Sequence, residues 1–493
     1  MKNESKFSKV LSILLSVVLV VSSFYLLYQV IRLNVLPSKF LFPLTIGVVV
    51  LDAIFILLLV YFSKNVVSKI VCIVLTLFIC VASCMGGYYI SKTQNVLSSI
   101  TNVAKHAKNT VSVIVKESSS IKNKSQLNGV SVGSLRLNEQ GSKKTLKELS
   151  GEGIVLNQTE YDSMTALLEA FYNGDVDSII INESSRSQIL DMEAYSNFDS
   201  NTRVVYQTSY KVKNNDSATS VSDITSKPFN VLISGSDTRG GFDENGRSDV
   251  IMIATVNPKT HTILLTSVPR DFYVTTACDA GDGCMQGALD KITHTGIHGT
   301  NTTKRTVEQL LGIEINYTFK VGFDTVTELV DVLGGVDVYV EPGYATTTSQ
   351  FSVHEGVNHL NAEQALAFAR ERYSYTEGDR QRTKNQQQVL MGIVKEATKP
   401  SVITNYAAIM DTMANTFSTT MSNEEITDLI KYQLNNNPTW KMEQYMVDGT
   451  GDTLMCAELG DAASVMVPDQ STVKMAKDKI NAVLAGKSSE DVK

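Results

Sequence analysis

Residues 229–271, FNVLISGSDTRGGFDENGRSDVIMIATVNPKTHTILLTSVPRD, predict three consecutive strands. The runs Phe229–Ser234, Asp249–Val256 and Ile263–Val268 are short, largely apolar and separated by turn-forming residues, which is typical of buried strands. The turn over Asn257–Thr260 is short, so the second and third strands are antiparallel neighbours. If the first strand is antiparallel to the second, its end lies at the same sheet edge as the end of the third.

Polar residues lie at that expected edge. Asp237 follows the first strand, Asp249 begins the second, and Arg270 and Asp271 follow the third. If the first strand is parallel instead, Asp237 leaves the group. Two carboxylates held close together repel unless a proton or cation relieves them, and oxygen ligands suit Mg²⁺. An isolated aspartate is more often a loop cap, but the pairing with Arg270 favours a Mg²⁺ site at Asp237 and Asp249.

A second polar set lies further along the chain, and it is rich in arginine. Its members, all within residues 370–386, are Arg370, Arg372, Asp379, Arg380, Arg382 and Gln386. The planar guanidinium suits bidentate contact with phosphate. Because the chain carries a net charge of −7, the set indicates one anionic ligand rather than general attraction to polyanions such as nucleic acid.

Helical spacing organises this set. Asn361 with Gln364 forms a variant of the capping box, and the helix that follows ends near Arg370 and Arg372. Asp379 can cap the next helix. One stripe of that helix, at spacings of three and four, comprises Arg382, Gln386, Val389, Leu390, Ile393 and Ala397. We expect the polar pair on this stripe to meet a partner or a ligand; salt bridges to Glu371 or Asp379 are the simpler alternative.

The first ninety residues predict a membrane anchor. Residues 10–31, 40–62 and 66–90 are each apolar and long enough to cross a bilayer at about 20 residues per helix. Lysines in the tail 1–9 and between the second and third spans favour a cytoplasmic N-terminus and an extracellular C-terminal body. Asp52 lies inside the second span, where a carboxylate either has a function or packs against a neighbouring helix.

The remaining chain predicts two α/β domains. Residues 91–213 form a small accessory domain that begins with a helical stalk over 91–110. Residues 214–227 form a linker, 228–486 the second domain, and 487–493 a disordered tail. Expected strands, besides those above, are Val111–Lys116, Val130–Leu135, Val176–Ile181, Tyr317–Val321 and Val336–Val340. Expected helices are Thr165–Tyr172, Thr303–Leu311, Thr325–Leu333, Asn361–Ala369, Arg380–Ala397 and Glu424–Leu434.

Two cysteines of the second domain, Cys278 and Cys284, bracket a short Gly/Asp loop. A disulfide between them fits an oxidising exterior. A zinc site is disfavoured because no histidine stands beside them. His294 and His298 lie in a polar loop, where lone histidines are more often structural than catalytic.

At these residues the sequence resembles the LytR-CpsA-Psr family, and within it the streptococcal capsule members. The matching stretches are Ser234-Gly-Ser-Asp-Thr-Arg239, Gly246-Arg-Ser-Asp-Val250, Ser267-Val-Pro-Arg-Asp271, Asp290-Lys-Ile-Thr-His294, Leu333-Gly-Gly-Val-Asp337, Leu360-Asn-Ala-Glu-Gln-Ala-Leu-Ala-Phe-Ala-Arg-Glu-Arg372 and Gly378-Asp-Arg-Gln-Arg-Thr-Lys-Asn-Gln386. Together they run in order through the second domain. The three spans and the accessory domain are also similar to the layout of the capsule members.

The resemblance implies an α/β/α sandwich with a lipid-binding tunnel. It implies an extracellular phosphotransferase that moves a glycan phosphate, such as capsular polysaccharide, from a polyprenyl-diphosphate carrier to peptidoglycan and releases polyprenyl phosphate. Asp237 and Asp249 match the Mg²⁺-associated aspartates. The positions that match diphosphate contacts are Arg247, Arg270, Arg370, Arg372, Arg382 and Gln386. Expected partners are the bilayer, peptidoglycan and other capsule-assembly proteins.

Catalysis is expected from Arg270, Arg372, Asp249 and Asp271, with Asp271, or alternatively Asp249, taking the proton of the attacking sugar hydroxyl. Two other activities fit the same residues. One is a non-enzymatic polyprenyl-phosphate receptor that regulates capsule synthesis, and the other is a lipid diphosphatase that uses water. Direct transcriptional control is disfavoured, because the tail before the first span is too short for a DNA-reading module.

Overall fold

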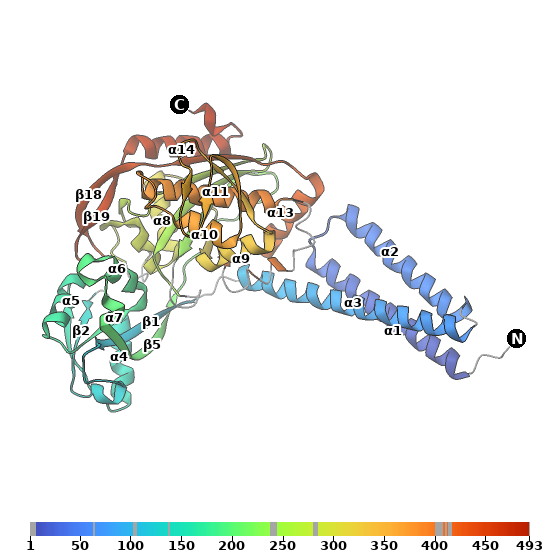
Figure 1. The fold of residues 1–493 in the computed structure, drawn as a ribbon, viewed down its shortest axis with the longest axis horizontal. Helices are drawn as coiled ribbons and strands as arrows, with labels where there is room; N and C mark the ends of the chain where they lie inside the picture. Colours follow the sequence, from blue (N-terminus) through green and yellow to red (C-terminus); the bar gives the residue numbers. More distant parts are fainter. Residues whose placement is uncertain are drawn as a thin grey trace. The chain divides into compact units, whose positions relative to one another are not determined.

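The computed structural model describes residues 6–62, 65–101, 106–136, 139–236, 244–279, 284–399, 408–409, 412 and 417–492. The chain divides into two compact units. The anchor unit comprises Met1–Thr101, Glu396–Ala414 and Ser422–Thr439, and the body unit comprises Asn102–Lys395, Asn415–Met421 and Trp440–Lys493. Figure 1 shows both units in the colours of the sequence.

The anchor unit contains, among the described residues, three helices that are long and apolar enough to cross a membrane. They are α1 (Lys6–Leu33), α2 (Ser38–Leu57, continued by a π-helical turn to Phe62) and α3 (Val66–Thr101). Each expected span lies within one of them, and α3 continues into the predicted stalk. The Ser23 hydroxyl donates to Asp52 across 2.9 Å, so Asp52 links α1 to α2. The amphipathic helix α13 (Asn423–Asn436) belongs to this unit too.

The accessory domain of the body unit is a sheet with helices on both faces. Its described strands have the order β3-β2-β4-β1-β5. In β4, Ile179 and Ile181 pack against helix α5, whereas Ile180 between them packs with Leu149 of α4. This alternation is the period-2 pattern of a strand buried on both faces. The strands are β1 (His106–Lys116), β2 (Ser131–Leu135), β3 (Asn157–Tyr161), β4 (Ser178–Asn182) and β5 (Thr202–Lys213), and the helices are α4 (Glu139–Gly151), α5 (Met164–Asn173), α6 (Arg186–Asp191) and α7 (Phe198–Asn201).

The second domain is built on a mixed sheet whose described strands have the order β16-β11-β6-β7-β8-β17. Strands β6, β7 and β8 are antiparallel neighbours, which confirms the arrangement expected from residues 229–271. The outer pairs β6–β11 and β8–β17 are parallel. The strands are β6 (Phe229–Ser236), β7 (Ser248–Asn257), β8 (Thr262–Ser267), β11 (Tyr317–Gly322), β16 (Phe417–Thr419) and β17 (Lys441–Met446).

Helices cover this sheet in two layers (Figure 1). On one face, Leu232, Ile253 and Leu264 of the sheet pack with Val307 of α8 and Ile480 of α14. On the other face, Gln387 of α11 donates to the backbone carbonyls of Leu265 and Tyr445. The helices are α8 (Thr300–Leu311), α9 (Phe323–Leu333), α10 (Ala362–Arg370), α11 (Asp379–Ala397) and α14 (Gln470–Leu484). The result is the α/β/α sandwich expected for the fold class.

Smaller elements complete the domain at its edges. Among them, a 3₁₀ segment over Ile292–His298 follows strand β10 and borders the candidate site. The remaining strands are β9 (Tyr273–Thr275), β10 (Leu289–Lys291), β12 (Val336–Val340), β13 (Thr346–Thr347), β14 (Ser352–Val353), β15 (Gly356–Leu360), β18 (Gly449–Cys456) and β19 (Asp461–Pro468).

Two segments expected to be irregular are tied to the domain. In 214–227, Asp216 accepts a 2.6 Å hydrogen bond from Thr318 of β11. The described part of the tail, 487–492, is not disordered as expected: Ser489 is buried and its N–H donates to Glu443 across 2.8 Å. Burial of the Glu443 carboxylate requires partners, and the tail supplies them.

Candidate functional site

The site begins at an irregularity between β6 and β7. The pairing register shifts between Gly235 and Ser236, next to the point where β7 carries Asp249. A Cβ on Gly235 would lie 2.8 Å from the Cβ of Val250, so only glycine allows this approach. Bulges of this kind re-aim side chains and are common beside active sites. Asp237, the residue after β6 in the sequence, lies outside the described residues.

Asp249 is the centre of the first half of the site. Arg270 NH1 donates to Asp249 Oδ1 across 2.8 Å, and the Thr293 hydroxyl lies 3.4 Å from the same oxygen. Arg247 NH2 lies 3.9 Å from it. The side chains of Asp249, Arg270 and Arg247 are only 11%, 17% and 12% exposed. The sheet edge therefore gathers these three predicted residues in a largely buried cluster.

Asp271 lies beside this cluster and is more accessible. Lys291 Nζ is 3.3 Å from Asp271 Oδ1, and Arg270 Nε is 3.9 Å from Asp271 Oδ2. The Asp271 side chain is 35% exposed. Lys291 and Thr293 are site residues that the sequence reasoning did not single out, although both lie in the quoted stretch Asp290–His294.

The arginine-rich set within residues 370–386 lies near the cluster around Asp249. Arg382 NH2 lies 2.7 Å from Asp379 Oδ1, and the Arg382 side chain is mostly buried. Burial lowers the pKa of Arg382, and the nearby positive charges of Arg270 and Arg372 act in the same direction. Burial also disfavours the charge on Arg270, but the carboxylates of Asp249, Asp271 and Asp379 outweigh it and raise its pKa. Charges this influential on each other lie close together, so the two halves of the site are near each other.

The other predicted residues lie around this core. Arg372 NH2 donates to the Tyr373 hydroxyl across 2.7 Å, and its guanidinium lies over that ring, 4.7 Å from the centroid. Arg370 is exposed at the end of α10, whose capping box from Asn361 is present as expected. Arg380 pairs with Asp448.

The buried face of α11 differs from the expected stripe. Its first turns bury Gln381, Asn385 and Gln387, while Arg382, whose side chain is mostly buried, and half-buried Gln386 lie beside that face. Asn385 donates to the Phe368 carbonyl across 3.0 Å. Hydrogen bonds to backbone carbonyls make buried amides acceptable there, which a search for apolar spacing does not detect. Arg382 and Gln386 therefore border the site instead of continuing the core.

Three arginines of the site share one feature. Among the described residues, the Nε–H groups of Arg247, Arg270 and Arg382 have no hydrogen-bond acceptor. A buried unpaired donor costs about 1–3 kcal/mol, and more when it is charged. Three such groups around one cluster indicate an anionic ligand with several acceptor oxygens, which phosphate provides.

The residues also fit a Mg²⁺ ion bound with such a ligand. The described part of the chain contains no group of three or more His, Cys, Asp or Glu side chains able to hold a metal. Mg²⁺ needs only one or two carboxylates when phosphate oxygens and waters complete its shell. Asp249 with the nearby Thr293 hydroxyl supplies hard oxygen donors of this kind.

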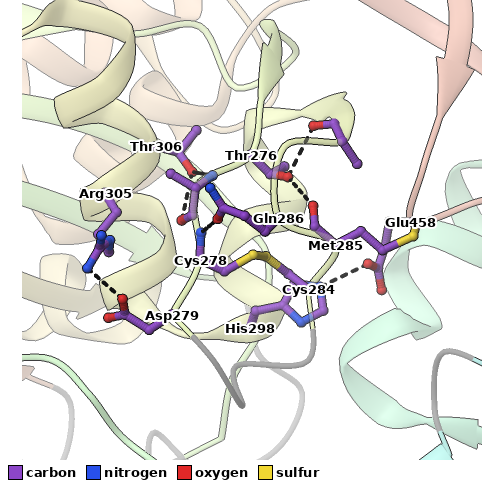
Figure 2. Close-up of a disulfide and its surroundings, with 12 residues drawn as sticks. Thr276, Cys278, Asp279, Cys284, Met285, Gln286, His298, Arg305, Thr306 and Glu458 are labelled. Atoms are coloured by element: carbon purple, nitrogen blue, oxygen red, sulfur yellow. Dashed lines mark hydrogen bonds and ion pairs between the residues drawn. A yellow bond between two sulfur atoms is a disulfide. The ribbon is translucent and has the colours of Figure 1, made fainter.

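The predicted disulfide and the two histidines form contacts that do not involve the arginines around Asp249. Cys278 and Cys284 are joined, and Asp279 pairs with Arg305 across 2.6 Å, as Figure 2 shows. His298 Nε2 lies 2.9 Å from Glu458, also drawn in Figure 2. His294 Nδ1 lies 2.7 Å from buried Asp290. Each histidine is thus held by a carboxylate within the fold, in line with a structural role.

The LytR_cpsA_psr family model matches residues 194–482, more than half of the chain. The chain belongs to the LytR_cpsA_psr family. The match includes the sheet of the second domain and every predicted site residue.

Curated relatives in the family carry a functional name. The polyisoprenyl-teichoic acid–peptidoglycan teichoic acid transferase TagU of Bacillus cereus (strain AH820) is 31% identical over 241 residues, covering 48% of this chain and 76% of the relative. The protein of the same name from Bacillus subtilis (strain 168) is 34% identical over 203 residues, covering 41% of this chain and 63% of the relative.

Solved structures are similar as well. Protein gbs0355 from Streptococcus agalactiae has a TM-score of 0.45 and 25% identity, over 53% of this chain and 89% of that one. TagU from Bacillus subtilis has a TM-score of 0.40 and 28% identity, over 52% and 97% of the two chains.

Proposed function

We propose that this protein is a membrane-anchored transferase. It moves a glycan phosphate from a polyprenyl-diphosphate carrier to peptidoglycan and releases polyprenyl phosphate. Membership of the LytR_cpsA_psr family and the transferase name of the curated relatives support this. The observation that carries it is the set of three buried guanidinium Nε–H groups around Asp249 that have no acceptor in the described part of the chain.

The glycan is capsular polysaccharide, and the body of the protein lies outside the cell. The resemblance to streptococcal capsule members, with spans and an accessory domain before the second domain, supports the first point. The lysines before and between the spans support the second. A tunnel in the second domain would take the lipid chain.

Diphosphate binding follows from the arginine geometry. The Nε–H groups of Arg247, Arg270 and Arg382 are buried and find no acceptor among the described residues, so each can contact a phosphate oxygen. Arg370, Arg372 and Gln386 supply further contacts at the border. Fixed positive groups at the diphosphate stabilise the charge that develops on the departing lipid phosphate.

A sugar hydroxyl of peptidoglycan attacks the phosphorus attached to the glycan. The new P–O bond forms as the bond to the lipid phosphate breaks, and polyprenyl phosphate leaves. Asp271 takes the hydroxyl proton, because its 35% exposed side chain is reachable by an acceptor, whereas Asp249 is 11% exposed and held by Arg270. Asp249 and Asp237 would hold Mg²⁺, which would supply further neutralisation of the diphosphate charge.

Transfer is tested directly with the full-length protein in lipid nanodiscs. The donor is an undecaprenyl-diphosphate-linked oligosaccharide, the acceptor is peptidoglycan, and Mg²⁺ is added. Mass spectrometry is expected to find a phosphodiester between glycan and peptidoglycan. Release of lipid phosphate without glycan attachment would instead indicate a diphosphatase, and tight donor binding without turnover would indicate a receptor.

A further inference from the structure

An ion pair links the accessory domain to an arginine of the candidate site. Asp191, the last residue of α6, pairs with NH1 of Arg247. The Arg247 side chain is 12% exposed and that of Asp191 is 59% exposed. The buried member of the pair thus belongs to the site, and the exposed member reaches it from the neighbouring domain.

This pair occupies only one side of the guanidinium. Nε and NH2 lie together on the edge opposite NH1, and this edge is the one that makes side-on bidentate contact with phosphate. Arg247 Nε is buried without an acceptor among the described residues, and NH2 lies 3.9 Å from Asp249. Asp191 therefore leaves the ligand-binding edge open and directed at the cluster, so it does not block the site.

A second contact holds the chain just before Arg247. Glu244 is buried, accepts a hydrogen bond from Thr110 and lies 3.1 Å from Lys108 Nζ, both on β1. Lys320 of β11 donates to the Glu244 carbonyl across 2.7 Å. The accessory domain thus holds both ends of the segment Glu244–Arg247, through β1 at one end and α6 at the other.

The domains also touch away from the site. Thr165 of α5 donates to Asp461 across 2.6 Å, and the Met164 N–H donates to the Leu459 carbonyl across 2.9 Å. A change at Asp191 therefore leaves other contacts that keep the domains together.

We propose that Asp191 is a positioning residue of the diphosphate site, and that the accessory domain serves to orient Arg247 toward the ligand. The proposal rests on the proposed function, since it assumes a diphosphate ligand. It assigns the accessory domain a direct part in substrate affinity. An ion pair with a member as exposed as Asp191 contributes little to the free energy of unfolding, so stability alone is a weak reason for this pair.

The test measures binding of geranylgeranyl diphosphate to the full-length protein in detergent micelles by isothermal titration calorimetry. We expect Asp191→Asn to raise Kd roughly threefold to fivefold, the factor expected for loss of one partly exposed charge pair. Asp191→Glu keeps the carboxylate and is expected to have a Kd close to that of the wild-type protein. Asp191→Asn added to Arg247→Ala is expected to cause no further loss, because the two residues act as one unit.

Asp199→Asn is the matched control. It removes a 3.0 Å ion pair with Arg186 inside the same domain and is expected to leave Kd unchanged. An unchanged Kd in Asp191→Asn, or an additive loss in the Arg247→Ala background, overturns the proposal while the proposed function stands. A wild-type protein that binds no diphosphate overturns both.

Discussion

Buried arginines occur in both domains of the body unit, and their surroundings differ. Arg186 of the accessory domain donates from Nε and NH2 to Glu183 across 2.6 and 2.8 Å, and from NH1 to Asp199 across 3.0 Å. Its guanidinium also lies over the Phe198 ring. Each nitrogen of this guanidinium thus has a carboxylate partner supplied by the fold.

The arginines around Asp249 are as buried but less well satisfied. Arg270 and Arg382 each have a close carboxylate, yet the Nε–H of each lacks an acceptor among the described residues. The same side chain thus occurs in two kinds of surroundings. Arg186 has every acceptor from the fold, whereas the site arginines keep donors that, among the described residues, are free for the ligand proposed above.

The largest effect is expected at the site. Arg270→Ala should lower the transfer rate by about 10²–10³-fold, the usual cost of losing one donor that stabilises developing charge. The measurement is glycan attachment to peptidoglycan, with circular dichroism to verify folding. Arg305→Ala, which removes an exposed arginine paired with Asp279, is the control and should retain activity. Full activity in both Arg270→Ala and Arg372→Ala would refute the assignment.

The reverse pattern is expected at Arg186. Arg186→Ala leaves Glu183 and Asp199 without their partner and should lower the free energy of unfolding of the accessory domain by about 3 kcal/mol. Transfer per folded molecule should stay unchanged below the unfolding transition. Urea titration of intrinsic fluorescence measures the first quantity. If Arg186→Ala leaves the free energy of unfolding unchanged but abolishes transfer, Arg186 does not differ in role from the site arginines.

A ligand should supply what the site arginines lack. Geranylgeranyl diphosphate at a hundred times its Kd is expected to stabilise the wild-type protein by about 2.7 kcal/mol. Thermal unfolding followed by circular dichroism reports the shift in Tm. Arg186→Ala should have a lower Tm without ligand but the same ligand-induced increase in Tm. Arg270→Ala should show a much smaller increase. Equal shifts in wild type and Arg270→Ala would show that binding occurs elsewhere.

The smallest effect is expected for the stability contribution of Glu443, whose carboxylate has hydrogen-bond partners within the fold. Burial opposes ionisation of Glu443, but hydrogen bonds from Lys441, Ser489 and Ser488 outweigh it and lower its pKa to about 2. The usual value is about 4.3, so this stabilisation is complete above that pH and is lost as pH falls toward 2. Glu443→Gln should cost about 1–2 kcal/mol at pH 7 and flatten the decline in stability between pH 5 and pH 2. An equally steep decline in the variant would exclude Glu443 as its source.

Local patterns predicted much of the fold. The apolar runs from Phe229 to Val268 gave three strands and their antiparallel order, and the Asn361–Gln364 capping box placed the start of α10. Both signals arise within a few residues and depend little on distant parts of the chain. The gathering of Asp249 and Arg270 followed from the same strand order.

Long-range contacts were not predictable in this way. Strand β17 was missed, because buried Glu443 and exposed Lys441 do not form the apolar pattern of a buried strand. Its strand structure depends on pairing with the distant β8. Asp191 was missed because it is one exposed aspartate at the end of a short helix, and only the folded structure brings it to Arg247. The stripe on α11 was right at Val389 and Ile393, which are buried. Its first part was misplaced, because the amides of Asn385 and Gln387 are buried there and bind distant backbone carbonyls.

The pairing of β8 with β17 has a consequence for biogenesis. Thr262 pairs with Lys441, so the edge of β8 stays open until β17, which comes much later in the chain, has been synthesised. An open, apolar strand edge invites pairing with other chains. A chain in which such distant segments must meet also folds slowly. The nascent body unit therefore passes through a state that depends on protection from aggregation, and truncations before Lys441 should accumulate as aggregates instead of as a smaller folded domain.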